Sequence, residues 1–269
     1  MTGPHADPAY LAACRDAGLL VRVGGVDCVL GRTEDALTGR DFCLVEYADP
    51  APESQDAAEA LRTHAVAAHP GVSGVLLRTG PGVRLRAPWT EHLTYLRHST
   101  DGAASGDRPA DVAVVPARPE HGERVRGWIA DAFQTGVAEG GLTVPRPDAE
   151  AQADAVLAAP GRHTLVALTA GGEPAGHATL LPFTDEVTGT EYLELFDILV
   201  PVPFETRALT GLLADAALAR AERAGLPLLG NVVHRTAGRG PDHGARVVSS
   251  LHRRGWRTDH VYWHAPTDR

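Results

Sequence analysis

The stretch that decides the fold is DILVPVPFETRALTGLL, residues 197–213. Its opening DILV is mostly apolar and runs into Pro-Val-Pro, which is typical of a strand that ends in a turn. From Thr210 the chain is rich in Ala and Leu up to Gly225, a pattern that predicts a helix with a glycine C-cap. The unpaired amides at the start of such a helix attract phosphate groups. The turn itself, however, contains no glycine that would let the backbone approach a phosphate closely.

The alternation of strands and helices continues on both sides of this junction. Apolar runs predict strands at 112–115, 163–183 (a hairpin that turns at 171–174), 191–200, 226–233 and 258–265. Helical spacing predicts helices through Val125, Ile129 and Phe133, and at 146–161, 210–225 and 245–256. This order predicts an α/β fold with a mixed sheet, in which two parallel strands flank the helix at 210–225.

The first hundred residues show a shorter version of the same order. Their pattern predicts a hairpin at 19–32, a strand at 41–50, a helix at 53–69 and two strands at 72–79 and 92–99. The stretch STDGAASGDRPAD at 99–111 is small and polar, as linkers are. We therefore predict two domains, 1–105 and 111–269, the first a degenerate, truncated repeat of the second. An unrelated α+β domain is the alternative for the first.

Composition limits the function. The 269 residues carry a net charge of −9, which argues against a nucleic-acid-binding surface and is compatible with an amine-bearing substrate. All 25 cationic residues are Arg; GC-rich coding DNA of the actinomycete type explains this, and avoidance of acylation on lysine is the alternative. Three scattered cysteines are too few for a disulfide framework or a zinc site, and we expect no metal. No apolar run reaches the roughly 18–20 residues that cross a bilayer. Because no signal peptide is seen either, we expect a cytoplasmic protein.

Three stretches within residues 112–266 carry a resemblance to a known family. GGEPAGHATL (171–180) resembles the central hairpin of the GCN5-related N-acetyltransferases (GNATs). DILV followed by a helix resembles their acetyl-CoA segment, and SLHRRGW (250–256) resembles the region before their last strand. The resemblance implies the GNAT acyltransferase fold. Tandem members of the superfamily, such as mycothiol synthase, pair a degenerate N-terminal repeat with an active C-terminal one, which is the arrangement predicted here.

The resemblance implies a site for acetyl-CoA, or another acyl-CoA, at the strand–turn–helix junction. GNATs usually have Arg/Gln-x-x-Gly-x-Gly/Ala in this turn; an alignment on Val200 puts Glu205, Ala208 and Thr210 at those positions. We expect the amides of 207–211 to hold the diphosphate with help from Arg207, and Glu205 to point away. A plain structural turn is the alternative. The residues expected to bind the cofactor are Ile198, Leu199, Val200, Thr206, Arg207, Ala208, Leu209, Thr210, Gly211 and Asn231.

Acyl transfer needs a general base, because the acceptor amine must lose a proton before it attacks. In many GNATs this base is a carboxylate on the strand before the turn, a place that Glu194 matches; a rim or salt-bridged carboxylate is the alternative. Strand alternation predicts that Glu194, Phe196 and Ile198 share one face. Asp197 is then expected on the other face. In GNATs a Tyr in the last helix often protonates the leaving thiolate, and that place falls here on Leu251 or His252, depending on a one-residue gap. We expect His252 to be the acid, with an exposed helix histidine as the alternative.

Further residues are expected near this site. Tyr192 and Tyr262 are the alternative proton donors that such a fold brings nearest. The loop HRTAGRGPDHG at 234–244 is longer than GNATs usually have there, and we expect it to contact CoA or to shape the acceptor pocket.

The predicted function is that of an acyl-CoA-dependent N-acyltransferase, with acetyl-CoA as the first choice. It acts on a small-molecule amine, in natural-product biosynthesis or resistance. The alternative is a non-catalytic GNAT-fold protein that binds a ligand or a partner protein. A third reading keeps the fold and changes the chemistry, as in decarboxylases or aminoacyl transferases. Both a monomer and a homodimer remain open.

Overall fold

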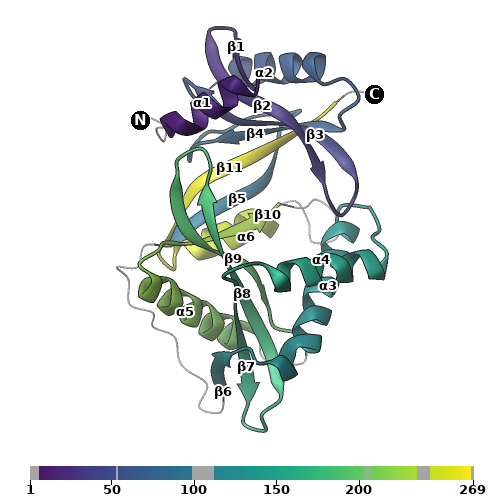
Figure 1. The fold of residues 1–269 in the computed structure, drawn as a ribbon, viewed down its shortest axis with the longest axis vertical. Coiled ribbons are helices and arrows are strands. Elements are labelled where there is room, and N and C mark those ends of the chain that lie inside the picture. The colour runs from purple at the N-terminus through teal and green to yellow at the C-terminus, as the bar shows by residue number, and fades with distance from the viewer. Residues whose placement is uncertain are drawn as a thin grey trace.

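The computed structural model describes residues 6–52, 54–98, 112–202, 204, 206–234 and 243–267, and describes Thr206 and Arg207 by their backbone alone. Helices lie beside and between long strands (Figure 1). The helices are α1 (Pro8–Asp16), α2 (Gln55–Ala68), the 3₁₀ turn η1 (Pro119–His121), α3 (Gly122–Ala138), α4 (Arg146–Ala158), α5 (Thr206–Ala224) and α6 (His243–His252). The strands are β1 (Leu20–Val23), β2 (Val26–Asp35), β3 (Arg40–Asp49), β4 (Gly74–Thr79), β5 (Thr90–His98), β6 (Val112–Pro116), β7 (His163–Thr169), β8 (Pro174–Asp185), β9 (Thr190–Leu199), β10 (Leu228–Val233) and β11 (Trp256–Pro266).

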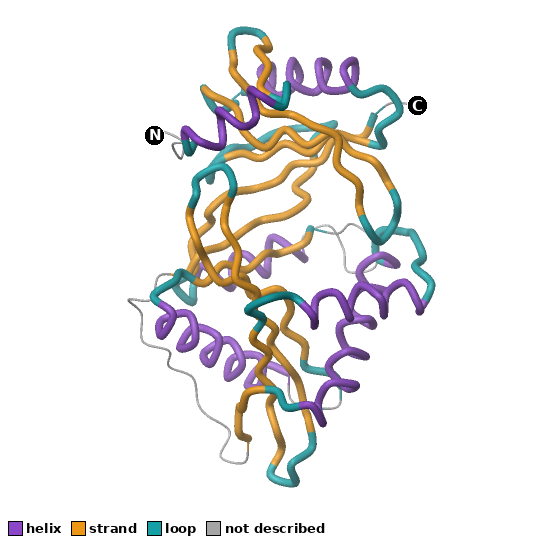
Figure 2. The backbone as a smooth tube through the Cα atoms, viewed as in Figure 1, coloured by secondary structure: helices purple, strands orange, loops and turns teal. Residues whose placement is uncertain are grey.

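These strands form one eleven-stranded sheet in the order β1-β2-β3-β4-β11-β5-β10-β9-β8-β7-β6, which Figure 2 shows running the length of the molecule. The two halves of the chain exchange strands at its centre. β5 of the N-terminal half lies between β11 and β10, while β11, the last strand, lies between β4 and β5. Each half therefore completes the sheet of the other. The predicted linker at 99–111 lies outside the described residues.

The two halves repeat the same strand geometry. β3 and β4 pair in parallel up to Val45 and Leu77, and β9 and β10 pair in parallel up to Leu195 and Gly230. In each half a β-bulge comes directly after the parallel pairing. The residue after Val45 and the residue after Leu195 each lack a partner on the neighbouring antiparallel strand. The predicted order of hairpin, strand, helix, strand and strand is confirmed in both halves, as is the parallel pair around α5.

The two faces of the sheet carry different helices. One face, here the α5 face, is covered by α5 and α6 and, in the N-terminal half, by α2; Leu213 and Leu228 are fully buried there. The other face, the α3 face, carries α3 and α4 over Val166 and Leu199. Burial of these apolar surfaces is the main force that holds the helices on the sheet. No described helix is long and apolar enough to cross a membrane.

Two predicted helix boundaries are wrong by four residues, and one α-helix was missed. α5 begins at Thr206 rather than at residue 210, so the polar residues before the Ala- and Leu-rich run belong to the helix. α6 ends at His252 rather than at 256, because Gly255 adopts a φ of 86° that reverses the chain into β11. α1 is short, and its start is fixed by Asp7, whose carboxylate accepts from the amide of Ala9 at 2.8 Å.

Candidate active site

The candidate site lies where β9 and β10 separate. The two strands pair in parallel at only three positions, the last being Leu195 with Gly230. Beyond that point β9 stays with β8 as far as Leu199, while β10 stays with β5 as far as Val233. Two parallel strands that diverge leave backbone amides and carbonyls of both without a partner between them. Such an opening suits a ligand that bonds to the main chain.

Gly176 on β8 lets the end of β9 take this course. A Cβ atom at residue 176 would stand 2.7 Å from the carbonyl oxygen of Leu199 and 3.0 Å from Cγ2 of Val200. Only a residue without a side chain therefore fits beneath the separating strand.

Gly176→Ala is expected to destabilise the protein by about 1–3 kcal/mol, because backbone must shift to relieve the clash. Urea unfolding measures the change. Gly211→Ala is the matched control: a Cβ there meets nothing within 4 Å, and within a helix alanine is favoured over glycine by about 0.8–1.0 kcal/mol. Equal urea-unfolding midpoints for the two variants would show that the close approach of β9 does not require glycine at residue 176.

A bulge at Phe196 changes which side chains share a face. Leu195 pairs with Leu180 and Asp197 pairs with Thr179, so residue 196 is the extra one. Because neighbouring positions on β8 point to opposite faces, Asp197 joins Glu194 on the α3 face. The prediction that Asp197 lies opposite Glu194 is therefore wrong.

Ile198, which was expected beside Glu194, is turned to the other face. It pairs with Ala178 and packs in the core beneath α5. A bulge cannot be read from alternation alone, and this one shifts every side chain after it by one face.

Glu194 is buried, with 8% of its surface exposed, and accepts a hydrogen bond of 3.3 Å from Nδ2 of Asn231. Burial raises the pKa of Glu194 above its usual value, and the bond from Asn231 opposes part of that rise. The sequence placed these two residues on different strands, and the structure brings them together. A carboxyl group with a raised pKa suits a proton acceptor that works near neutral pH.

Three tyrosines surround Glu194. Tyr192 precedes it on β9, Tyr95 comes from β5 and Tyr262 from β11, and each senses the charge of Glu194. Burial is the main cause that raises the pKa of all three phenols, so each keeps its proton as a hydrogen-bond donor. None of their hydroxyls has a hydrogen-bond partner among the described residues. Tyr95 pairs with Asn231 across β5 and β10, and sequence reasoning missed it because it belongs to the other half of the chain.

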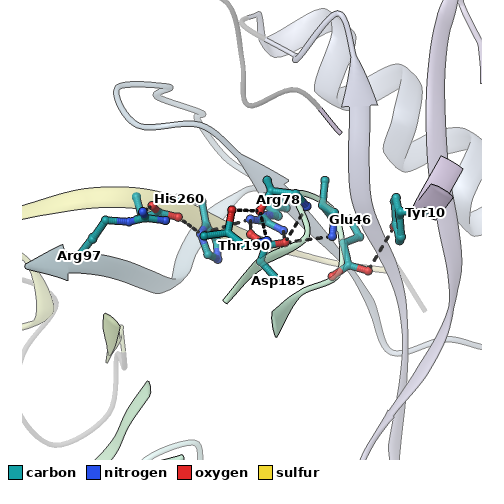
Figure 3. Close-up of polar contacts among 10 residues, drawn as sticks. Tyr10, Glu46, Arg78, Arg97, Asp185, Thr190 and His260 are labelled. Carbon is teal, nitrogen blue, oxygen red and sulfur yellow. Dashed lines mark hydrogen bonds and ion pairs between the residues drawn. The ribbon is translucent and has the colours of Figure 1, made fainter. Parts of the chain in front are cut away.

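A largely buried ion pair ties the hairpin of β8 and β9 to the N-terminal half (Figure 3). Arg78 on β4 donates to both carboxylate oxygens of Asp185, at 3.0 and 2.5 Å. Burial alone would raise the pKa of Asp185, but the bonds and charge of Arg78 hold it below its usual value. Glu46 lies nearby; burial raises its pKa, and its carboxylate accepts from the hydroxyl of Tyr10 at 3.5 Å.

A second polar group extends this network along the centre of the sheet. His260 stacks on Tyr95, with ring centroids 4.4 Å apart, and its Nδ1 lies 2.8 Å from the carboxylate of Asp259. Arg97 donates to the same carboxylate at 3.0 Å. Residues of β4, β5, β8, β9 and β11 thus meet on the α3 face, beside Glu194.

The residues expected to hold the diphosphate, 207–211, lie in the first two turns of α5, which follows β9. Leu209 is buried under the helix, so its side chain serves packing. The first turn of a helix leaves its amides without helical partners. Because α5 begins at Thr206, the free amides lie at 206–208, and Thr210 and Gly211 lie a turn inside the helix. The side chains of Thr206 and Arg207, and Glu205 as a whole, lie outside the described residues.

His252 is not brought to Glu194. Its Nε2 lies 3.0 Å from Oγ1 of Thr258, at the exposed end of α6. Thr258 pairs with Leu96, whose side chain is in the core beneath α5, so His252 belongs to the α5 face and Glu194 to the α3 face. Most of the loop at 234–244 lies outside the described residues. Within the described part of the chain, no three His, Cys, Asp or Glu side chains are grouped to hold a metal ion.

Comparison with solved structures identifies the architecture. An acetyltransferase of the GNAT family from Colwellia psychrerythraea matches with a TM-score of 0.53 at 12% identity, over 93% of this chain and 84% of that one. The chain has the GNAT fold. The predicted resemblance is thus confirmed at the level of the fold, and the resemblance to mycothiol synthase stays a prediction.

Other solved structures match the chain with lower TM-scores. A functionally unknown conserved protein from Staphylococcus epidermidis has a TM-score of 0.49 at 11% identity, over 87% of this chain and 93% of that one. A ribosomal-protein-alanine N-acetyltransferase from Brucella melitensis has a TM-score of 0.36 at 18% identity, over 52% of this chain and 90% of that one. No family model and no curated protein matches the chain.

The N-terminal half of the chain differs from the C-terminal half at the start of the helix that follows its parallel strand pair. Ser54 caps α2 by accepting from the amide of Ala57 at 3.2 Å. The side chain of Gln55 bonds to the main chain of Arg86, at 2.8 Å to its amide and 3.2 Å to its carbonyl. The helix start is therefore occupied by the protein's own side chains, whereas a diphosphate needs such amides free.

Proposed function

We propose that the protein is an acyl-CoA-dependent N-acyltransferase, with acetyl-CoA as the preferred donor and a small-molecule amine as acceptor. The observation that carries this proposal is the separation of β9 and β10 directly before α5. Such an opening offers unpaired main-chain groups for the pantetheine arm, and α5 offers the amides at 206–208 for the diphosphate. The cofactor residues Ile198, Leu199, Val200 and Asn231 lie along the same opening.

Acyl-CoA, when bound, supplies the acyl group as a thioester. The remaining chemistry falls to the residues of the α3 face. Glu194 takes a proton from the acceptor amine, since its raised pKa matches that task better than an exposed carboxylate would. Asn231 holds the carboxylate in place. Of the candidate proton donors to the leaving thiolate, Tyr95, Tyr192 and Tyr262 lie on the face of Glu194, and His252 lies on the other face.

Calorimetric titration with acetyl-CoA tests the proposal. We expect one molecule to bind per chain, because the start of α2 in the N-terminal repeat is occupied. Pantetheine, which lacks the diphosphate, should bind much more weakly. Two sites per chain would contradict our reading of the N-terminal repeat, and no heat and no thermal shift at millimolar acetyl-CoA would exclude the function itself.

Ala208→Pro sharpens the same experiment. The amide of residue 208 has no helical carbonyl partner, so proline there removes one free amide without removing a helical hydrogen bond. The variant should therefore lose acetyl-CoA affinity while keeping its unfolding midpoint, and Ala208→Ser, which retains the amide, should bind as the wild type does. Binding without turnover over a panel of amines would favour the non-catalytic GNAT-fold alternative, for which the glycine-free turn is the supporting feature.

A further inference from the structure

His177 is a buried polar residue that the proposed reaction does not yet use. It lies on β8 with none of its surface exposed, and its ring stacks on Trp128 of α3 with centroids 5.7 Å apart. Its Nε2 stands 3.2 Å from Oδ2 of Asp197. Neither of these two buried atoms has a well-aligned hydrogen bond among the described residues. Polar groups buried in this way are rare, and near active sites such bonds often tighten only when substrate binds.

A chain of hydrogen bonds fixes the orientation of the His177 ring. Arg162 donates from Nη1 to Oγ1 of Thr164 at 2.6 Å, and Thr164 lies 3.1 Å from Oγ1 of Thr179. Thr179 in turn lies 3.2 Å from Nδ1 of His177. A guanidinium only donates, so Thr164 accepts from Arg162, and the hydroxyl proton of Thr164 is available for a bond to Thr179. The carboxylate of Asp197 only accepts, so Nε2, which faces it, carries the ring proton and Nδ1 is left to accept from Thr179.

One carboxylate oxygen of Asp197 thus faces the protonated Nε2 of His177 at 3.2 Å. Its side chain is 20% exposed, more than that of His177. The bulge at Phe196 places it on the α3 face with Glu194, on the part of β9 that has left β10. Of the two carboxylates on this face, Asp197 is the more exposed, since Glu194 is buried.

We propose that Asp197, oriented by His177, binds the ammonium group of the acceptor and presents it to Glu194. This rests on the proposed acyl transfer and adds a second carboxylate with a different task. Asp197 contacts the acceptor, whereas His177 is a positioning residue that acts through Asp197. The two threonines and Arg162 hold His177 in the tautomer that this requires.

The proton and bond changes then balance. The acceptor arrives as an ammonium ion bonded to Asp197, and one of its protons passes to Glu194 and on to solvent. The neutral nitrogen attacks the thioester carbonyl carbon, so that a C–N bond forms and the C–S bond breaks. The second proton lost by the nitrogen neutralises the leaving thiolate. The products are an amide, a free thiol and one proton in solution.

Nitrogen-15 NMR of labelled histidines tests the site without any turnover, with His177→Gln used to assign the signal. We expect the Nε2-protonated tautomer for His177, and loss of that preference in Thr179→Val. Ethanolamine, putrescine and glucosamine are then added without CoA; at least one should shift the His177 signal, and none should do so in Asp197→Asn. A protonated Nδ1, or no shift with any of the three amines, would overturn the proposal.

Steady-state kinetics separates the two carboxylates. For the best amine of the panel, Asp197→Asn should raise KM by about tenfold or more, with a much smaller change in kcat and none in acetyl-CoA affinity. Asp197→Glu should restore part of the affinity, and Glu191→Gln, an exposed carboxylate on the same strand, is the matched control. An unchanged KM in Asp197→Asn contradicts the proposal. If acetyl-CoA does not bind, the proposed acyltransferase function is excluded. The amine titration still decides whether Asp197 binds amines.

Discussion

Replacing Arg78 with methionine is expected to lower the free energy of unfolding by about 3–5 kcal/mol, the largest stability change we predict. The side chains of Arg78 and Asp185 are 9% and 13% exposed, so the variant leaves a buried carboxylate without a cation. Arg78 also lowers the pKa of Glu46, which loses that support. Because the pair links β4 to the hairpin of β8 and β9, the two halves should also lose cooperativity. Urea unfolding followed by two probes, one in each half, measures both effects.

Two further variants show whether burial is the cause. Arg78→Met combined with Asp185→Leu should recover most of the loss, because an apolar pair of similar size replaces a buried ion pair at little cost. Arg32→Met removes an exposed cation from its pair with Asp41 in the same half, and should change stability far less. Equal losses in Arg78→Met and Arg32→Met would contradict the role given to Arg78.

The same ion pair gives stability a pH dependence. Because Arg78 holds the folded-state pKa of Asp185 below its unfolded value of about 3.9, the pair contributes fully above that value. The contribution is lost as the pH falls through the lowered pKa. Glu46 and Glu194 act in the opposite sense, since their raised pKa values favour the folded state at low pH and cost stability as the pH rises. Arg78→Met should therefore flatten the acid side of the stability profile.

Glu194→Gln is expected to slow acyl transfer by about 10²–10⁴-fold in kcat, with acetyl-CoA affinity nearly unchanged. The amide keeps the shape of the side chain and removes the proton acceptor. In the wild type, activity should fall as the pH drops through the raised pKa of Glu194, and this acid limb should vanish in the variant. Thiol release from acetyl-CoA over a pH series measures it, and an unchanged rate would leave Glu194 a structural carboxylate.

Asn231→Leu provides the matching test of the environment of Glu194. The variant removes the hydrogen bond that opposes the rise in pKa, so the acid limb should move to higher pH. Glu191→Gln, on the exposed part of the same strand, should leave the profile in place. If the pH at which activity falls is the same in Asn231→Leu as in the wild type, another group controls the rate.

Much of the fold followed from the sequence because it depends on local pattern. The apolar runs on either side of 171–174 and the Ala- and Leu-rich run after Thr210 gave the hairpin and the helix that the structure contains. The glycine-free turn was recognised as the place of the candidate site by its position between a strand and a helix. The alternation of β9 also gave one wrong prediction, because the bulge at Phe196 cannot be recognised from the pattern of apolar and polar residues. It moved Asp197 to the face of Glu194 and Ile198 away from it.

By itself, the sequence determined the kinds and order of elements, the repeat of that order and the carboxylate on β9, because these reside in neighbouring residues. Only the tertiary structure decided that β5 and β11 are exchanged between the halves. The exchange brings Tyr95 and Tyr262 to Glu194, and Arg78 to Asp185, which are 107 residues apart in the sequence. Strand pairing across such distances is set by which faces bury the most apolar surface together, and no local pattern encodes it.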